Sequence, residues 1–448
     1  MKNKRRDFLK TLGLASAAAV VPLSALADEK AASALLSRPF NSGNNAETIN
    51  LALIGAGGMG SSDTETALQH ENVKLIAVCD LYDGRLDDAK KRWGSHLFLT
   101  KDYKEVLKRS DVDAVIIGTP DFWHKKISID ALNAGKHVYC EKPMVHSVDE
   151  GHDIIKAWKK SGKVYIVGSQ GMSSLGNEKA KELLEQGVIG DLNYAEGFWA
   201  RNSPVGAWQY PIPEDASTDT VDWDKYLSIT KKRSWDPLRF FRWRNYLDYG
   251  TGMSGDLFVH LFSSLHFITS SKGPDKIAAT GGLRYWKDGR EVPDVLLGMF
   301  DYPKTKEHPA FNLSLRCNFV DGTSGSTFLR IVGSKGSMDV EWDKLTLKLN
   351  TGVEDDDPFL EEKGKSESAN KDRKKIVPPL TTEYTAQKGY KGAHYDHFAN
   401  FFDAIRNNGK VIQDPEFGFR AAAPALLCNE SYEQNKFISW DPEKMTKK

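Results

Sequence analysis

The stretch NLALIGAGGMG at positions 50–60 decides the fold of the first part of this 448-residue chain. An apolar run typical of a buried strand leads directly into a G-x-G-x-x-G pattern. In such a pattern Gly55 allows a sharp turn, Gly57 lets the backbone approach a pyrophosphate, and Gly60 lets a helix pack closely on the sheet. Asp80 ends the next apolar run, where a carboxylate can accept hydrogen bonds from ribose hydroxyls and repel a 2′-phosphate. The pattern therefore predicts a dinucleotide site that takes NAD rather than NADP.

Apolar runs and amphipathic stretches alternate between residues 47 and 168, as in a parallel sheet covered by helices on both faces. This order predicts a doubly wound NAD-binding domain over residues 47–168. The expected strands are residues 50–54, 73–79, 114–117, 137–140 and 164–167.

The chain after Gln170 has longer apolar runs with tighter turns between them. Runs of neighbouring strands predict an α+β domain over residues 169–448 with a large, mostly antiparallel open sheet. Residues 353–383 are low in apolar content and rich in charge, so we expect them to form a polar excursion from this domain. The expected strands are residues 193–200, 276–280, 295–301, 313–319, 327–332, 337–342 and 345–349, and the expected helices are residues 178–186, 256–269, 394–407 and 416–434.

The N-terminal residues resemble an export leader. Arg5 and Arg6 are adjacent and are followed by a short alanine-rich run and the small-residue pattern Ala25-Leu26-Ala27. The run is too short to span a membrane, so we interpret residues 1–27 as a twin-arginine signal peptide, with an ordinary secretion leader as the alternative. No cysteine lies near the cleavage pattern, so no lipid anchor is expected. We therefore expect a periplasmic protein that is exported folded, with its cofactor already bound.

Composition excludes several kinds of partner. Lys plus Arg and Asp plus Glu are balanced at 61 each, and the leader is basic, so the rest of the chain is mildly acidic. This balance gives no electrostatic case for binding nucleic acid or an anionic membrane. The cysteines are widely spaced without a C-x-x-C pair, so neither a disulfide framework nor a metal site is predicted. Each is expected to be a buried small apolar residue, at Cys79, Cys140, Cys317 and Cys428.

Two further motifs follow later strands of the first expected sheet. Residues 118–124 read GTPDFWH and residues 135–143 read GKHVYCEKP. Together with the glycine pattern, they resemble the Gfo/Idh/MocA oxidoreductases, which include glucose–fructose oxidoreductase and inositol dehydrogenase. The resemblance extends over essentially the whole chain after the leader, including residues 256–260 and the C-terminal Trp440-Asp441. It implies bound NAD, contacted by Gly55, Gly57, Gly58, Met59, Gly60, Asp80, Thr119, Pro120, His124, Glu141, Lys142 and Gln170.

The resemblance also implies a catalytic role for Lys142, which ends a strand on the side of the sheet where open α/β folds bind ligands. Asp256 and His260 are four residues apart on an expected helix and so share one face. The family pattern at this helix is D-x-G-x-H-x-x-D, with the histidine facing the substrate. This chain keeps the first aspartate and the histidine but has Phe258 for the glycine and Ser263 for the second acid, which leaves the substrate open. A merely structural pair is the alternative for Asp256 and His260.

Aromatic and basic residues gather upstream of this helix, where residues 239–246 read RFFRWRNY. Aromatic faces beside hydrogen-bonding groups suit a pyranose, which offers C–H faces for stacking and hydroxyls for hydrogen bonds. Aromatic packing between the domains is the alternative for each ring. The expected substrate contacts are Trp199, Arg201, Arg242, Trp243, Arg244 and Tyr249, with Trp208 as a further candidate.

These motifs predict an NAD-dependent dehydrogenase that oxidises a secondary hydroxyl of a sugar or glycoside, with C3 of a glucoside as a first candidate and a tightly bound cofactor recycled in place. The alternative is a glycoside hydrolase that oxidises its substrate transiently, as some members of the family do. Those relatives lack a lysine at the position of Lys142, which favours the dehydrogenase. A non-catalytic sugar-binding module would have lost Lys142, Asp256 and His260. Because the second sheet needs both faces covered, we also expect a homodimer or homotetramer.

Overall fold

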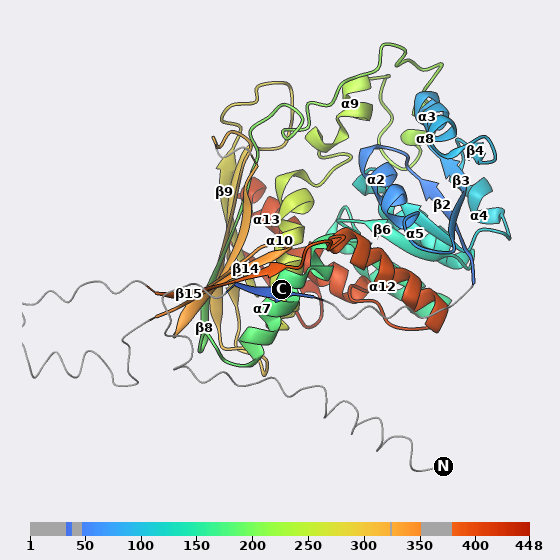
Figure 1. The fold of residues 1–448 in the computed structure, drawn as a ribbon. Coiled ribbons are helices and arrows are strands. Elements are labelled where there is room, and N and C mark those ends of the chain that lie inside the picture. The colour runs from blue at the N-terminus through green and yellow to red at the C-terminus, as the bar shows by residue number, and fades with distance from the viewer. Residues whose placement is uncertain (1–32, 38–46, 323–324, 351–378) are drawn as a thin grey trace, which may run out of the picture.

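Two sheets, each packed against its own helices, lie next to each other in the computed structural model (Figure 1). The structure describes residues 33–37, 47–322, 325–350 and 379–448. The expected leader at residues 1–27 and most of the expected polar excursion lie outside the described residues. Among the helices that are described, none is long and apolar enough to cross a membrane.

The first sheet is the expected parallel sheet, in the order β4-β3-β2-β5-β6-β7, and its neighbouring strands all run parallel. Helices cover both faces, so its central strands are fully buried, as predicted from their continuous apolar runs. Sequence analysis missed β4 (Phe98–Thr100), because three residues are too few to show a pattern. The other strands are β2 (Ile49–Ile54), β3 (Val73–Cys79), β5 (Ala114–Ile117), β6 (His137–Glu141) and β7 (Tyr165–Gly168), and the helices are α2 (Gly58–Ala67), α3 (Asp83–Trp93), α4 (Tyr103–Lys108), α5 (His124–Asn133) and α6 (Gly151–Ser161).

The second sheet has eleven strands, in the order β1-β15-β14-β13-β12-β8-β11-β10-β9-β16-β17. It is mostly antiparallel, as expected, and the two parallel pairs are β1 with β15 and β8 with β11. The expected strands are present as β8 (Leu192–Ala200), β9 (Lys276–Gly282), β10 (Val295–Tyr302), β11 (Phe311–Asn318), β12 (Thr327–Gly333), β13 (Gly336–Val340) and β14 (Lys344–Leu349). Four strands were missed: β1 (Ser33–Leu36), β15 (Leu380–Ala386), β16 (Ile438–Asp441) and β17 (Thr446–Lys447).

Strand β15 corrects the predicted end of the polar excursion at residue 383. Residues 380–383 pair antiparallel with β14 instead of leaving the domain. Thr382 is buried while its neighbours are partly exposed, which is the alternation of a half-buried strand. Threonine and tyrosine favour this environment, although their run lacks the aliphatic residues that make a strand conspicuous in a sequence.

The second sheet is covered by helices on the face toward the first domain (Figure 1). These helices are α7 (Leu175–Glu185), α10 (Val259–Thr269) and α13 (Pro415–Gln434). Helix α13 begins as predicted, since Asp414 accepts a hydrogen bond from Phe417 N and Pro415 occupies the first turn. On the opposite face Leu297 and Met299 of β10 are 44% and 62% exposed, with no described helix over them. The expected homodimer or homotetramer stays a prediction, which light scattering can test.

Two segments of the second domain reach the first domain. Helix α12 (Ala393–Asn407) packs on the parallel sheet, where Phe398 stacks on Tyr139 with ring centroids 4.3 Å apart. Residues 201–250, here called the arm, carry the short helices α8 (Trp223–Tyr226) and α9 (Pro237–Phe241).

Backbone hydrogen bonds attach the arm beside β3. Asp83 N donates to Thr220 O at 3.0 Å, and Asp222 N donates to Leu81 O at 2.9 Å. The Trp123 indole also donates to Tyr226 O at 3.2 Å. The arm therefore closes over the end of the sheet where the glycine pattern lies.

Candidate active site

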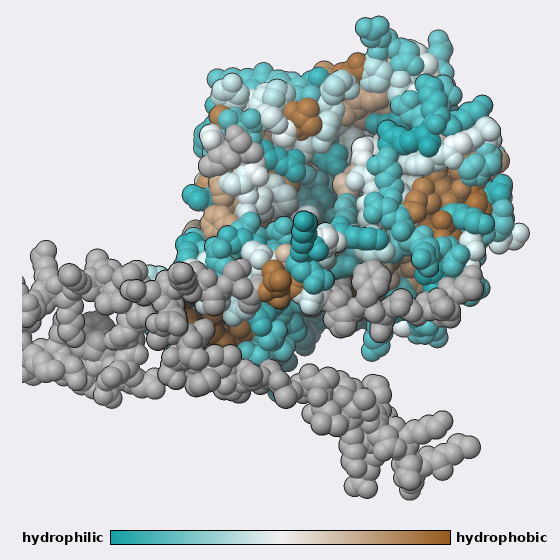
Figure 2. Space-filling view, viewed as in Figure 1, coloured by the Kyte–Doolittle hydropathy of each residue, from teal (hydrophilic) through white to brown (hydrophobic). Residues whose placement is uncertain are grey.

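A cavity of about 690 Å³ lies where the carboxyl ends of the parallel strands meet the arm and the second sheet. Figure 2 shows the surface hollowed between the two halves of the molecule. Open α/β sheets bind their ligands at this end of their strands. The cavity is lined by the glycine turn and strand ends of the first domain, by the arm, by residues around the start of α10, and by Trp199, Trp342 and His394 from other segments.

The glycine turn has the shape of a nucleotide cradle. Gly55 has a φ of +93°, and a Cβ there would lie 2.7 Å from the backbone of Gly118 and Thr119. A Cβ on Gly60 would lie 2.1 Å from the Gly55 carbonyl oxygen, whereas one on Gly58 would meet open space. Helix α2 thus packs tightly on the sheet while its first turn remains open to the cavity. These residues fit the pyrophosphate of a dinucleotide, which binds at helix N-termini of this kind.

Asp80 stands at the cavity wall with both carboxyl oxygens held by backbone N–H groups. Its Oδ2 accepts from Ala56 N at 2.8 Å and its Oδ1 accepts from Tyr82 N at 3.0 Å. Arg85 also lies 3.5 Å from Oδ1. Its guanidinium lies 5.6 Å from the ring centroids of Phe240 and Phe241 in the arm, and it lines the cavity.

Two of the expected cofactor contacts, His124 and Gly60, do not line the cavity. His124 is buried and does not line the cavity. Its Nδ1 lies 2.7 Å from Pro143 O and its Nε2 lies 2.9 Å from Thr119 O. The ring therefore links the segment after β5 to the segment after β6. The other expected contacts line the cavity, with the exception of Gly60, which lies behind the turn: Gly55, Gly57, Gly58, Met59, Asp80, Thr119, Pro120, Glu141, Lys142 and Gln170.

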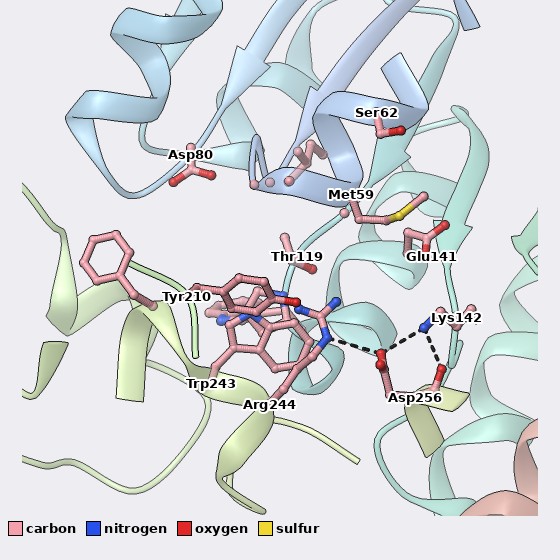
Figure 3. A pocket seen from close by; sticks show the side chains of 18 of the residues that line it. Met59, Ser62, Asp80, Thr119, Glu141, Lys142, Tyr210, Trp243, Arg244 and Asp256 are labelled. Atoms are coloured by element: carbon pink, nitrogen blue, oxygen red, sulfur yellow. Dashed lines mark hydrogen bonds and ion pairs between the residues drawn. The ribbon is translucent and has the colours of Figure 1, made fainter. Parts of the chain in front are cut away.

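Lys142, Asp256 and Arg244 form a buried ionic cluster on one wall (Figure 3). The Lys142 Nζ donates to Asp256 Oδ1 at 2.8 Å and to the Asp256 carbonyl oxygen at 2.7 Å. The Arg244 Nε donates to the same Oδ1 at 3.2 Å. Burial alone would raise the pKa of Asp256, but the charges of Lys142 and Arg244 hold it far below its usual range. Asp256 is therefore ionised and fixes both cations at the cavity.

The expected helix over residues 256–269 is α-helical only from Val259. Residues Ser254–Phe258 form a π-helical turn that leads into α10. Turns of this type are rare and concentrate at functional sites. Asp256 lies in the π-turn and His260 in the first turn of α10, and both line the cavity.

His260 lies between two indole rings. Its ring centroid is 5.3 Å from that of Trp199, in a stacked arrangement, and 6.4 Å from that of Trp342. Burial, and next the charge of Lys142, place the pKa of His260 well below its ordinary value, so the ring is neutral. Its buried Nδ1 has no hydrogen-bond partner among the residues that the structure describes. A neutral imidazole at a cavity wall can accept a proton from a ligand at its unprotonated nitrogen.

The structure places four of the expected substrate residues at the cavity and two away from it. Arg242 is directed to the arm, where it donates to Tyr210 O at 2.7 Å and to Gln209. Tyr249 is fully buried and packs on Phe122 and Tyr226. Neither side chain lines the cavity: Arg242 holds two parts of the arm together, and Tyr249 packs the arm on the first domain, as in the packing alternative. The residues at the cavity are Trp199, Arg201, Trp243 and Arg244, together with the further candidate Trp208.

Sequence analysis missed two cavity residues that come from distant segments. Trp342 was assigned to a strand, but it lies in the turn after β13, is 42% exposed and lines the cavity. His394 comes from the start of α12 and also lines the cavity. Neither residue has a local motif, and a lone tryptophan between two strand runs was the only available signal. Among the described residues, no group of His, Cys, Asp and Glu side chains could hold a metal ion, and the four cysteines are buried without disulfides.

Comparison with known proteins identifies both halves of the chain. Residues 49–169 match an oxidoreductase family described by its NAD-binding Rossmann fold. Residues 181–439 match the C-terminal alpha/beta domain of the same family. An alpha-N-acetylgalactosaminidase from Shewanella oneidensis is 30% identical over 232 residues, which cover 46% of this chain and 50% of that protein. A glycosyl hydrolase family 109 protein from Shewanella baltica is 30% identical over 210 residues, covering 44% and 45%. The chain thus spans about half the length of the curated relatives it matches.

Solved structures share the fold over most of the chain. A levoglucosan dehydrogenase in complex with NADH and levoglucosan has a TM-score of 0.62 and 17% identity, covering 88% of this chain and 99% of that one. An aldose-aldose oxidoreductase from Caulobacter crescentus has a TM-score of 0.63 and 16% identity, covering 88% and 100%. The two domain matches agree with the arrangement of the glycine cradle, the ionic cluster and the open sheet. The chain therefore belongs to the Gfo/Idh/MocA oxidoreductase family and carries its NAD-binding Rossmann domain.

Proposed function

We propose that this protein oxidises a secondary hydroxyl of a sugar or glycoside and keeps its NAD bound between turnovers. The observation that carries the proposal is the arrangement of Lys142, Asp256 and His260, which line the same cavity as the nucleotide cradle. When bound at the cradle, NAD supplies the acceptor for the electron pair that leaves the substrate carbon. The remaining task of the site is to bind the sugar and to move one proton.

Lys142 is suited to hold the reacting hydroxyl. A lysine ammonium has three N–H donors, and two of them are directed to Asp256. The third is available to a substrate oxygen, whose developing negative charge the ammonium stabilises. Asp256 cannot compete for the proton, because it stays ionised between two cations.

His260 is suited to accept the hydroxyl proton. Its ring is neutral and the residue lines the cavity, so it can take a proton from a bound hydroxyl. Trp199 fixes one face of the ring by stacking. Positioning a base of this kind typically accelerates proton transfer by about 10²- to 10⁴-fold.

The cavity wall around this pair suits a pyranose. Trp199, Trp243 and Trp342 offer aromatic faces, and the Arg244 guanidinium lies 4.2 Å from the ring centroid of Trp243. Stacking on C–H faces with charged donors at the rim is the chemistry that recognises sugars. The family resemblance makes position 3 of a glucoside the first hydroxyl to test.

The arm supports the proposal that NAD is retained. Tyr226, Phe240 and Phe241 of the arm line the cavity together with Asp80, and the arm is attached by backbone hydrogen bonds beside β3. Release of a nucleotide from this end would require those hydrogen bonds to open. Retention would also suit the periplasmic location proposed from the leader, where lost NAD is not replaced.

A second candidate is a glycoside hydrolase that oxidises its substrate transiently. In that mechanism a hydroxyl two carbons from the glycosidic carbon is oxidised, and the resulting ketone acidifies the C–H between them. Elimination then breaks the glycosidic bond, water adds to the alkene, and the ketone is reduced again. The names of the curated relatives favour this candidate, since they include an alpha-N-acetylgalactosaminidase and glycosyl hydrolase family 109 proteins. Lys142 favours the dehydrogenase, as the family resemblance implies.

Incubation with aryl glycosides distinguishes the two candidates. A panel of aryl glucosides, galactosides and N-acetylgalactosaminides is incubated with the purified protein, with and without a second carbonyl compound as acceptor. With an acceptor, the proposal expects repeated turnover to a keto-glycoside two hydrogens lighter than the substrate by mass spectrometry; without one, its formation stops at the amount of bound NAD. Release of the phenol without any acceptor would instead establish the hydrolase.

A further inference from the structure

Asp63 is a fully buried carboxyl in α2 that the proposed reaction does not use. Its Oδ1 lies 3.0 Å from His394 Nε2 and 3.4 Å from both the Tyr139 hydroxyl and Gln170 Nε2. Its Oδ2 has no hydrogen-bond partner within the described parts of the chain. An ionised carboxylate is costly in such a place, because among the described residues no lysine or arginine contacts it and none donates to its second oxygen.

Glu141 is a second buried carboxyl that shares a contact with Asp63. Its Oε1 accepts from Gln170 Nε2 at 2.6 Å, and the same nitrogen lies 2.9 Å from the Tyr139 hydroxyl. One amide nitrogen therefore contacts both carboxyls and the phenol between them. Glu141 faces the cavity between Met59 and Lys142 (Figure 3). The two carboxyls thus lie at the ends of one hydrogen-bonded cluster, with Glu141 at the cavity and Asp63 next to His394.

The charges around the pair favour a bound proton. Burial raises the pKa of Asp63 to about 8, and Lys142 only partly opposes this shift. Burial and the charge of Asp63 raise the pKa of Glu141 to about 8. The Lys142 ammonium is already engaged by Asp256, so it does not neutralise the pair. The titratable groups that face the pair are Tyr139 on β6, Lys142 just after β6, His124 on α5 and His394 on α12.

His394 connects the pair to solvent. Its side chain is 28% exposed, and its Nε2 lies 3.0 Å from Asp63 Oδ1. Burial lowers the pKa of His394, so the ring is neutral and can pass a proton by accepting one at one nitrogen and donating one from the other. The stacking of Phe398 on Tyr139 holds this turn of α12 against β6.

We propose that Asp63 and Glu141 form a carboxyl dyad that holds one proton, and that the dyad exchanges protons between the cavity, through Glu141, and solvent, through His394. This inference rests on the proposed function, because oxidation of a hydroxyl leaves a proton that must depart from the cavity. The proton that His260 accepted leaves its N–H bond and forms an O–H bond at Glu141. The O–H bond at Asp63 breaks, and its proton forms an N–H bond at His394, which then releases a proton to water. No electrons are exchanged, so the dyad is neither oxidised nor reduced.

Infrared titration of the full-length protein as purified tests the dyad without a substrate. The C=O band of a protonated buried carboxyl should be present at about pH 6 and lost by about pH 10. Asp63→Asn should lower the midpoint of the remaining band by about one pH unit or more, because Glu141 loses a like charge. Glu141→Gln, measured independently, should reduce the band. Asp121→Asn, at a buried carboxyl outside the cluster, serves as the matched control and should leave the midpoint unchanged.

Three outcomes would overturn the dyad. The first is the absence of a C=O band that is present at about pH 6 and lost by about pH 10. The second is an unchanged midpoint of this band in Asp63→Asn, and the third is an equal shift of the midpoint in Asp121→Asn. None of them depends on turnover, so a failed dyad and a failed dehydrogenase assignment are distinguishable.

The role of His394 has its own test in an active preparation. His394→Ala should slow turnover by about tenfold or more, and added imidazole should restore part of the rate, as expected for a missing proton carrier. A merely structural role would give a slow variant that imidazole does not rescue. His394→Ala with the wild-type rate would also overturn the route.

Discussion

Two buried carboxyls near the cavity, Asp256 and Asp63, differ in their charge state. Asp256 is buried beside Lys142 and Arg244, and its pKa lies far below the usual range. Asp63 is linked through Gln170 to Glu141, which lines the cavity; no lysine or arginine of the described residues contacts it, and burial raises its pKa to about 8. Burial alone therefore does not decide the charge of a carboxyl; the neighbours that remain after burial decide it. Asp256 stays ionised with Lys142 and Arg244 in the ionic wall, whereas the pair of Asp63 and Glu141 can gain and lose a proton near neutral pH.

The largest expected effect comes from breaking the ionic wall. Lys142→Ala should reduce turnover by about 10²-fold or more, because the substrate oxygen loses its positioned cation. NAD content should stay the same, since the cradle is unchanged. Steady-state rates and heat-released nucleotide measure the two quantities. Lys125→Ala is the matched control, because Lys125 forms a surface ion pair with Asp153 outside the cavity; wild-type turnover in Lys142→Ala would remove Lys142 from the mechanism.

A pair of neighbouring arginines sharpens the boundary of the ionic wall. Arg244→Ala should lower kcat/KM by about tenfold or more, the usual scale for a lost charged hydrogen bond. Arg242→Ala should change kcat/KM much less, because Arg242 contacts the arm and not the cavity. Both variants are measured with the same glycoside, and thermal unfolding checks that each is folded. Equal kinetic losses would show that Arg242 belongs to the site after all.

Much of this account was available from the sequence, and the limit lies in side-chain direction. The parallel sheet, the glycine cradle and the positions of Lys142 and Asp256 follow from local patterns and motif spacing. Arg242 and Arg244 could not be separated, because the short turns after α9 decide which one faces the cavity.

The missed features depend on contacts between segments far apart in the chain. His394 reaches Asp63 across 331 positions, and no local motif announces it. Strand β15 exists because β14 offers it an edge, and Trp342 reaches the cavity because β13 ends two residues before it. Such features follow from tertiary packing, which overrides local propensity.

The smallest expected effect is on the pH dependence of the free energy of unfolding, which has opposite signs for Asp256 and for the pair of Asp63 and Glu141. Asp256 has a lowered pKa, so it stabilises the folded state above about pH 4 and loses this contribution at lower pH. Asp63 and Glu141 have raised pKa values of about 8, so their contribution to stability falls as pH rises from about 4 to about 8. Denaturant titrations at a series of pH values give the free energy of unfolding as a function of pH. Between about pH 4 and pH 8 this free energy can fall by up to about 1.4 kcal/mol per pH unit for one proton, and Asp63→Asn should make that fall less steep. An unchanged slope would mean that Asp63 is ionised in the folded protein.

The central claim is that retained NAD oxidises a sugar hydroxyl at the wall formed by Lys142, Asp256 and His260. A single-turnover experiment tests it directly: protein purified without added nucleotide is mixed with excess glycoside, and no acceptor is present. The account predicts reduced-nicotinamide absorbance equivalent to the NAD content, together with an equal amount of keto-glycoside. Protein without nucleotide, or phenol release without any oxidised sugar, would contradict it.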